Sequence, residues 1–151
     1  MPPPTKIASG AGSVAIEWLR AGRGMRAIAI ERDPTRAARI AANAERLGVP
    51  ELVVHTGAAP AGLAELPAPA AIFVGGGIAA PGLLDLCWNR LGQGGRLVAN
   101  AVSVAGEAAL LACHAIHGGK LLRLQLARAG TVGTQLVWRP AMPVTQLVVR
   151  K

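Results

Sequence analysis

Short apolar segments alternate along this chain with segments of helical periodicity, and this alternation restricts the fold more than any other feature. The predicted helices are residues 13–21, 34–47, 81–91 and 107–116. The first four predicted strands are residues 27–31, 52–55, 70–74 and 96–102. Parallel neighbouring strands need long crossover connections, which are usually helical. The alternation therefore predicts an α/β fold with a doubly wound, mostly parallel sheet.

The two ends of the chain depart from this alternation. Residues 121–129 and 144–149 are predicted to pair as antiparallel strands around a loop at residues 138–143. Residues 1–6, MPPPTK, form a proline-rich leader that we expect to lie outside regular sheet, because proline has no N–H for strand pairing. With 151 residues, the chain is expected to form a single domain over residues 1–151.

A run of small residues precedes the first predicted helix. Gly10 and Gly12 within it allow a sharp turn and a close approach to a ligand, and the free N–H groups at the start of the helix lie beside that turn. The next strand ends on Glu31, roughly twenty residues further on, where nucleotide-binding α/β folds place a carboxylate that binds both ribose hydroxyls. Loop and acid predict a site for an adenosine-containing ligand; the alternative is that Glu31 only caps the next helix.

Further candidate residues follow the other predicted strands, because ligands of parallel sheets bind at the carboxyl ends of the strands. The loops expected there span residues 8–13, 31–33, 57–60, 75–77 and 100–104. Asn100 and Ser103 either meet a substrate or only form a turn. Trp138, next to Arg139, is a candidate for a substrate-binding or subunit-contact surface.

The charge balance favours an anionic partner. Sixteen Lys and Arg against eight Asp and Glu give a net charge of +8, which attracts anions. With one Phe, three Trp and no Tyr, the chain has few side chains on which bases could stack. We therefore do not expect a nucleic-acid partner, and a small polyanionic substrate fits the charge as well as RNA does.

Cysteine usage and hydropathy point to the cytoplasm. Cys87 and Cys113 lie in apolar helical segments without paired ligand spacing, as reduced core thiols do. No metal site is expected at Cys113, His114 and His117, because no fourth ligand is near them in the sequence. We expect no secretory leader, because the first residues lack its basic and apolar pattern, and the apolar stretches of the sequence are all shorter than a membrane span of about 18 residues.

Five phrases, taken together and in order, resemble the decarboxylating precorrin methyltransferases of cobalamin biosynthesis. They are GAGSVAIEW (10–18), AIERDP (29–34), AIFVGGG (71–77), GGRLVANAV (94–102) and WRPAMPVTQ (138–146). The resemblance implies a class I S-adenosylmethionine-dependent methyltransferase fold, which is Rossmann-like and closed by a C-terminal antiparallel hairpin. It also implies methylation of carbon-15 of a precorrin with loss of carbon dioxide from the ring-C acetate, a homotetramer, and a partner domain for carbon-5.

The resemblance also implies which residues bind ligands. For the cofactor S-adenosyl-L-methionine they are Thr5, Ala8, Ser9, Gly10, Ala11, Gly12, Glu31, Arg32, Gly57, Ala58, Ala59, Gly75 and Gly76. By this resemblance, Gly10 and Gly12 would line the methionine end of the cofactor, and Glu31 would hold its ribose. Residues 57–59 would border the adenine, and residues 75–76 would leave room beside the transferring methyl group. For the polyanionic precorrin they are Asn100, Ser103, Arg128, Trp138 and Arg139. No catalytic group is predicted.

Departures from the family pattern keep two alternatives open. The family has an aspartate and a glycine where this chain has Lys6 and Ala8, and acids are common in it at Ala58, Ala70 and Ala105. Its Pro-x-Thr-Lys phrase precedes the first strand, whereas here residues 3–6 join directly to the glycine loop. We therefore expect the first strand to be short or missing, through an internal deletion or an incomplete gene model. The alternatives are an inactive pseudoenzyme or non-catalytic subunit, and an RNA methyltransferase of the same fold.

Overall fold

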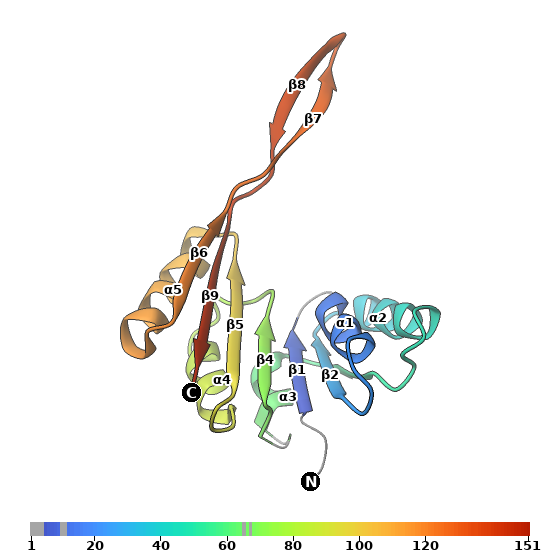
Figure 1. The fold of residues 1–151 in the computed structure, drawn as a ribbon, viewed down its shortest axis with the longest axis vertical. Coiled ribbons are helices and arrows are strands. Elements are labelled where there is room, and N and C mark those ends of the chain that lie inside the picture. The colour runs from blue at the N-terminus through green and yellow to red at the C-terminus, as the bar shows by residue number, and fades with distance from the viewer. Residues whose placement is uncertain (1–4, 10–11, 65, 67) are drawn as a thin grey trace.

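A computed structural model describes residues 5–9, 12–64, 66 and 68–151, and its main feature is a seven-stranded sheet (Figure 1). The strand order is β3-β2-β1-β4-β5-β9-β6, with β1 to β5 parallel and β9 antiparallel to both its neighbours. The strands are β1 (Thr5–Ser9), β2 (Arg26–Glu31), β3 (Val53–Thr56), β4 (Ala71–Val74), β5 (Arg96–Ala101), β6 (Lys120–Leu124) and β9 (Val144–Arg150). The described helices are α1 (Ser13–Arg20), α2 (Pro34–Arg46), α3 (Ala59–Ala64), α4 (Leu83–Arg90) and α5 (Val104–His117).

The first strand is present, so the expectation that it is missing was wrong. Strand β1 has five residues and lies between β2 and β4, where Ile7 pairs with Ile28 and Ile72. Thr5 and Lys6, assigned to the leader, belong to this strand; the rest of the leader, residues 1–4, lies outside the described residues. Lys6 is tolerated because its Nζ leaves the sheet, lying 3.3 Å from the Met25 sulfur and 5.4 Å from the centre of the Trp18 ring.

Helices lie on both faces of the sheet, as predicted. On one face, α1 and α2 pack on Ala27 and Ala29 of β2 through a core that includes Ile16 and Ile40. On the opposite face, α3, α4 and α5 pack on alternate residues of the other strands, among them Ile7, Ile72, Leu97 and Leu147. In the described part of the chain, no helix combines the length and apolar character that a membrane crossing needs.

Local capping explains where two helices begin. The Asp33 side chain accepts hydrogen bonds from the N–H groups of Thr35 and Arg36, at 2.8 and 3.1 Å, ahead of Pro34, so the predicted start of α2 is confirmed. Both hydrogen bonds lower the pKa of Asp33, and the bond from the Arg36 N–H has the larger effect. Helix α5 begins three residues before the predicted Glu107, because the Ser103 hydroxyl accepts the Gly106 N–H at 3.1 Å. Helix α3 was not predicted.

The C-terminal hairpin is longer than predicted and has two parts. Strands β6 and β9 pair antiparallel, which confirms the predicted closure. Between them, residues 125–143 do not continue β6 or form a loop but contain β7 (Ala127–Val132) and β8 (Gln135–Pro140), a separate two-stranded sheet. This sheet extends away from the body of the molecule, and we call residues 125–143 the arm (Figure 1). Trp138 therefore lies in a strand of the arm.

Candidate functional site

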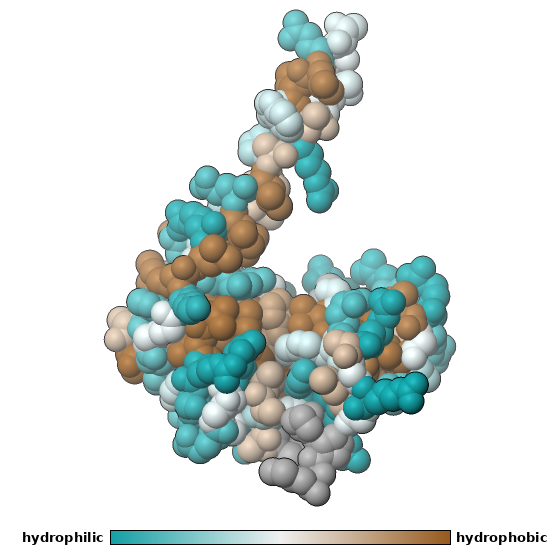
Figure 2. Space-filling view, in the orientation of Figure 1, coloured by the Kyte–Doolittle hydropathy of each residue, from teal (hydrophilic) through white to brown (hydrophobic). Residues whose placement is uncertain are grey.

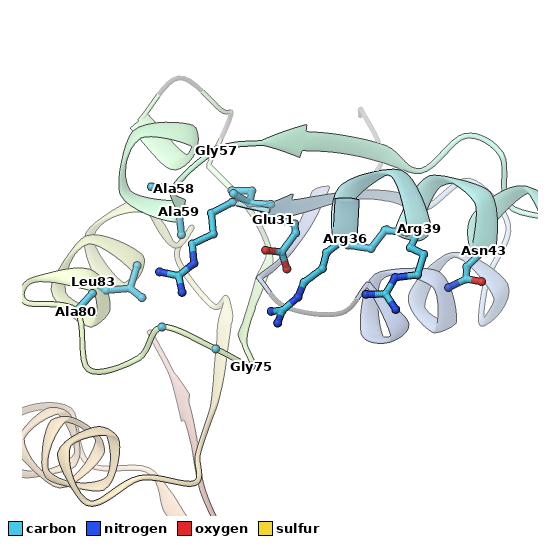
Figure 3. A pocket seen from close by; sticks show the side chains of 15 residues that line it. Glu31, Arg36, Arg39, Asn43, Gly57, Ala58, Ala59, Gly75, Ala80 and Leu83 are labelled. Atoms are coloured by element: carbon cyan, nitrogen blue, oxygen red, sulfur yellow. The ribbon is translucent and has the colours of Figure 1, made fainter. Parts of the chain in front are cut away.

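A cavity of about 600 Å³ lies where the carboxyl ends of β2, β3 and β4 meet (Figure 3). Its size is in the range of small-molecule and cofactor pockets. The lining residues are Ile30, Glu31, Arg32, Arg36, Arg39, Ile40, Asn43, Gly57, Ala58, Ala59, Gly75, Gly76, Gly77, Ala80 and Leu83. The set contains one carboxylate, three guanidinium groups and mostly small or apolar side chains.

Glu31 is the acid of this cavity. It is only 7 % exposed, and its Oε1 accepts the Asp33 N–H at 3.0 Å. Its backbone carbonyl accepts the Gly57 N–H at 2.9 Å, which ties the end of β2 to the segment that follows β3. Figure 3 shows the carboxylate pointing into the same space as the side chain of Arg36, with no ion pair between them. A carboxylate held in this way can accept hydrogen bonds from a ligand's hydroxyls.

Two loops of small residues also line the cavity. Residues 57–59 follow β3 and residues 75–77 follow β4. A Cβ added at Gly57, Gly76 or Gly77 would meet no atom within 4 Å, so the space beside these backbones is open. A ligand can therefore approach the main chain closely on this side.

The end of the glycine loop is fixed against the helix that borders the cavity. Gly12 has φ +80° and begins α1, and a Cβ placed on it would lie 2.6 Å from Cγ2 of Ile40. Ile40 itself lines the cavity. Gly12 thus fixes the start of α1 close to α2 without lining the cavity. Gly10 and Ala11 lie outside the described residues, and for Ala8 and Ser9 the backbone of β1 is described.

The structure brings together seven of the residues predicted to bind the cofactor. Glu31, Arg32, residues 57–59, Gly75 and Gly76 all line the cavity. Thr5 does not: it lies at the amino end of β1, the opposite end of that strand from the cavity, and its carbonyl accepts the Ala70 N–H at 2.8 Å. Thr5 is therefore not among the residues that the structure places at the cavity.

None of the five residues predicted for the substrate lines the cavity. The Asn100 amide oxygen accepts a hydrogen bond from Gln146 at 2.9 Å on the sheet face, and the Ser103 hydroxyl caps α5. The other three lie on the arm. Arg128 of β7 lies opposite Arg139 of β8 in the strand register, and Trp138 is 75 % exposed. Arg139 donates a hydrogen bond to the Thr131 carbonyl at 2.6 Å.

Sequence reasoning missed the contribution of α2. Arg36 and Arg39 were not among the predicted site residues; both are exposed, yet both border the cavity together with Asn43. The sequence did contain a signal, because residues 36, 39, 40 and 43 fall on one face of a helix. Since Ile40 is apolar and lies on the buried side of this helix, the residues beside it on the same face could have been placed near the same edge.

The remaining candidate groups have structural roles. The His117 ring stacks on Trp88 with centroids 3.9 Å apart. Both cysteines are buried, and burial raises the pKa of the Cys87 thiol to about 12. Within the part of the chain that the structure describes, no three His, Cys, Asp or Glu residues group as ligands for a metal ion.

The fold and the site define a class of protein. A mostly parallel sheet closed by an antiparallel last strand, with an acid at the end of β2 beside small-residue loops, is the arrangement of class I S-adenosylmethionine-dependent methyltransferases. The family model of the precorrin methyltransferase domain matches residues 6–151, and the chain belongs to this family. The resemblance noted in the sequence is thereby confirmed.

Named relatives agree with this assignment. The chain is 54 % identical over 140 residues to a precorrin-6Y C(5,15)-methyltransferase [decarboxylating] of Sinorhizobium sp, covering 93 % of this chain and 34 % of the relative. It is 42 % identical over 145 residues to the protein of that name from Mycobacterium tuberculosis (strain CDC 1551 / Oshkosh), covering 96 % and 37 %. It therefore spans about a third of the length of these relatives.

Solved structures lead to the same family. The crystal structure of the C-terminal domain of precorrin-6Y C5,15-methyltransferase from Rhodobacter capsulatus superimposes with a TM-score of 0.89 and 38 % identity. The match covers 100 % of this chain and 82 % of that one. The chain thus corresponds to one domain of longer relatives.

Proposed function

We propose that this chain is an S-adenosylmethionine-dependent methyltransferase that methylates carbon-15 of a precorrin, with loss of carbon dioxide from the ring-C acetate. The observation that carries the proposal is the convergence of the buried Glu31 carboxylate with the loops at residues 57–59 and 75–77 in one cavity of about 600 Å³. The names of the relatives, which include both the methylation and the decarboxylation, support the choice of substrate.

The residues present fit the cofactor. Glu31 has a carboxylate that faces the cavity, and among the described residues its Oε1 accepts a hydrogen bond from the Asp33 N–H. Glu31 would accept the ribose hydroxyls, residues 57–59 would border the adenine, and Gly75 and Gly76 would leave room for the reacting end. S-adenosylmethionine, when bound there, would supply an electrophilic methyl group. Methyl transfer depends on an in-line, water-poor approach, so the chain acts mainly by positioning.

The charge of the rim suits a substrate rich in carboxylates. Arg32, Arg36 and Arg39 stand beside the cavity, and the sequence has a net charge of +8. These charges would steer a polyanion toward the site, and such steering weakens as salt screens it. The KM for the precorrin should therefore rise with ionic strength, whereas the affinity for S-adenosylhomocysteine should change little.

Two measurements test the proposal in sequence. Isothermal titration with S-adenosylhomocysteine should give saturable binding, and Glu31→Gln should weaken it by roughly 10-fold or more, since a charged acceptor is lost. Glu45→Gln is the matched control, because Glu45 is exposed on α2 and does not line the cavity. Equal affinity of all three proteins would refute the assignment of Glu31.

The second measurement uses methyl-labelled S-adenosylmethionine with precorrin-6B or with total RNA. Label in the macrocycle together with release of carbon dioxide supports the proposal. Label in RNA selects the RNA methyltransferase, and cofactor binding without any transfer selects the pseudoenzyme. Lys6 stands where the family has an aspartate, and Lys6→Asp tests whether that departure limits activity.

We further propose that the protein forms a homotetramer through the arm and acts in the cytoplasm. Leu126, Leu136, Trp138 and Met142 of the arm are 64–75 % exposed, more apolar surface than a monomer usually leaves in water. Replacing residues 125–143 by Asn-Gly should leave a monomer in sedimentation equilibrium. The reduced, buried Cys87 and Cys113 suit the cytoplasm. Carbon-5 would be methylated by a separate partner domain, since the relatives are longer.

A further inference from the structure

The charge of the cavity lining does not complement the charge of the cofactor proposed for it. Arg32, Arg36 and Arg39 contribute three positive charges and Glu31 contributes one negative charge, so the lining has a net charge of +2. Among the described residues, none of these four side chains forms an ion pair. S-adenosylmethionine carries one net positive charge, whereas the product S-adenosylhomocysteine has lost the sulfonium charge and is neutral overall. The lining by itself therefore favours the product over the cofactor.

Two of the three arginines stand together on α2. Arg36 and Arg39 are three residues apart and so share one face of that helix. In Figure 3 both side chains extend from α2 in the same direction as the Glu31 carboxylate. Both are exposed, and Figure 2 shows hydrophilic surface along the upper side of α2. Their charges thus border the cavity and remain accessible to an anion from solvent.

The acid that caps α2 offsets this charge only in part. Asp33 does not line the cavity, and its carboxylate accepts the N–H groups of Thr35 and Arg36. The hydrogen bond from the Arg36 N–H lowers the pKa of Asp33 most, and the charges of Arg36 and Arg39 lower it further. One carboxylate here faces two guanidinium groups, so an excess of positive charge remains on the α2 side of the cavity.

We propose that Arg36 and Arg39 couple the binding of the two substrates: a polycarboxylate bound at this rim raises the affinity for S-adenosylmethionine relative to S-adenosylhomocysteine. The inference rests on the proposed function of the cavity. Carboxylates that pair with the two guanidinium groups cancel the repulsion that the sulfonium meets, and the neutral product gains nothing from this. Because such coupling is reciprocal, the cofactor also raises the affinity for the polycarboxylate by the same factor. Without that substrate, the cavity prefers the spent cofactor.

The expected size of the effect follows from Coulomb's law. Inside a cavity of about 600 Å³, lining charges and ligand are separated by distances on the order of 8 Å. At that distance in water, one unit charge changes the affinity for a monovalent cation by roughly 2-fold. The two charges on α2 should therefore change the preference for a neutral over a cationic ligand by roughly 4-fold at low salt, and by less at high salt.

Isothermal titration measures this preference without methyl transfer. The ligands are S-adenosylhomocysteine and sinefungin, a stable analogue in which an ammonium group replaces the sulfonium. The quantity compared is the ratio of their two Kd values. Combining Arg36→Gln with Arg39→Gln should shift this ratio by roughly 4-fold in favour of sinefungin. Arg26→Gln is the matched control, because Arg26 is exposed at the amino end of β2, away from the cavity, and it should leave the ratio unchanged.

A carboxylate-rich macrocycle, uroporphyrin, then tests the coupling itself. Saturating uroporphyrin should shift the ratio of the unaltered protein in the same direction as the double substitution, and should have little effect on the doubly substituted protein. A ratio that neither the double substitution nor uroporphyrin changes would overturn the coupling. Equal weakening of both ligands by uroporphyrin would also overturn it, since the macrocycle would then occupy the cofactor cavity. Failure of the unaltered protein to bind either ligand would instead refute the proposed function.

Discussion

Gly12→Ala should destabilise the protein far more than an ordinary glycine substitution, because two penalties act at one position. The backbone has φ +80°, where an L residue costs about 1–2 kcal/mol. The added Cβ would also lie 2.6 and 2.8 Å from the two γ carbons of Ile40, which is buried, and overpacking of this kind costs about 1–3 kcal/mol. The sum is roughly 2–5 kcal/mol, or a fall of about 4–20 °C in the thermal midpoint for a chain of this size.

Gly48→Ala separates the two penalties. Gly48 has φ +78°, nearly the same as Gly12, but a Cβ there meets nothing within 4 Å, so only the backbone cost of about 1–2 kcal/mol remains. Urea unfolding of both variants measures the difference. Repeating Gly12→Ala in an Ile40→Ala background removes the clashing carbons, and the cost should then fall to that of Gly48→Ala. If Gly12→Ala costs no more than Gly48→Ala in the unaltered chain, the contact with Ile40 does not position the loop.

Three further predictions concern groups outside the cavity. Hydrogen bonds from the Thr145 hydroxyl and Arg123 lower the pKa of Glu107. The ionised Glu107 therefore stabilises the fold above the ordinary carboxyl pKa, and this stabilisation is lost as the pH falls through the lowered pKa. Between pH 5 and pH 2 the thermal midpoint of Glu107→Gln should fall less steeply than that of the unaltered protein. Lys151→Met should cost about 1–3 kcal/mol in urea unfolding, because the Lys151 ammonium donates to three carbonyls at the end of α4. Cys87, with its pKa raised to about 12, should resist iodoacetamide at pH 8 in the native protein and react once urea unfolds it, and rapid native labelling would contradict its burial.

The parts of the fold that local chemistry encodes were predictable. Asp33 and Pro34 mark the start of α2, and the apolar strand ending on Glu31 has a clear pattern, so both elements and the acid were placed correctly. Strand β1 was missed because prolines precede it and Lys6 interrupts its apolar residues. It forms because neighbours on both sides pair with its backbone, which is a property of the sheet and not of the segment.

The arm could not be predicted for a related reason. Its strands β7 and β8 lie outside the core, so they lack the alternation of buried and exposed residues that marks a strand, and Pro140 with Pro143 suggests a loop. Most of the cavity was found because its glycines stand directly after predicted strands. Arg36 and Arg39 were missed because a residue at the rim of an open cavity is as exposed as one that faces solvent.

The excess positive charge of the chain stands on more than one surface, and the distance between these surfaces makes the proposed steering of the substrate testable. Arg36 and Arg39 stand at the rim of the cavity on α2, whereas Arg96 and Arg150 lie opposite each other at the amino end of β5. The cavity is at the carboxyl ends of the strands, so the length of a strand lies between the two groups. That length is roughly 13 Å or more, beyond the Debye length at physiological salt, so charge reversal at Arg96 and Arg150 should leave the attraction of a polyanionic substrate nearly unchanged. A large rise in the KM for the precorrin in that variant would mean that one continuous field, and not two local ones, guides the substrate.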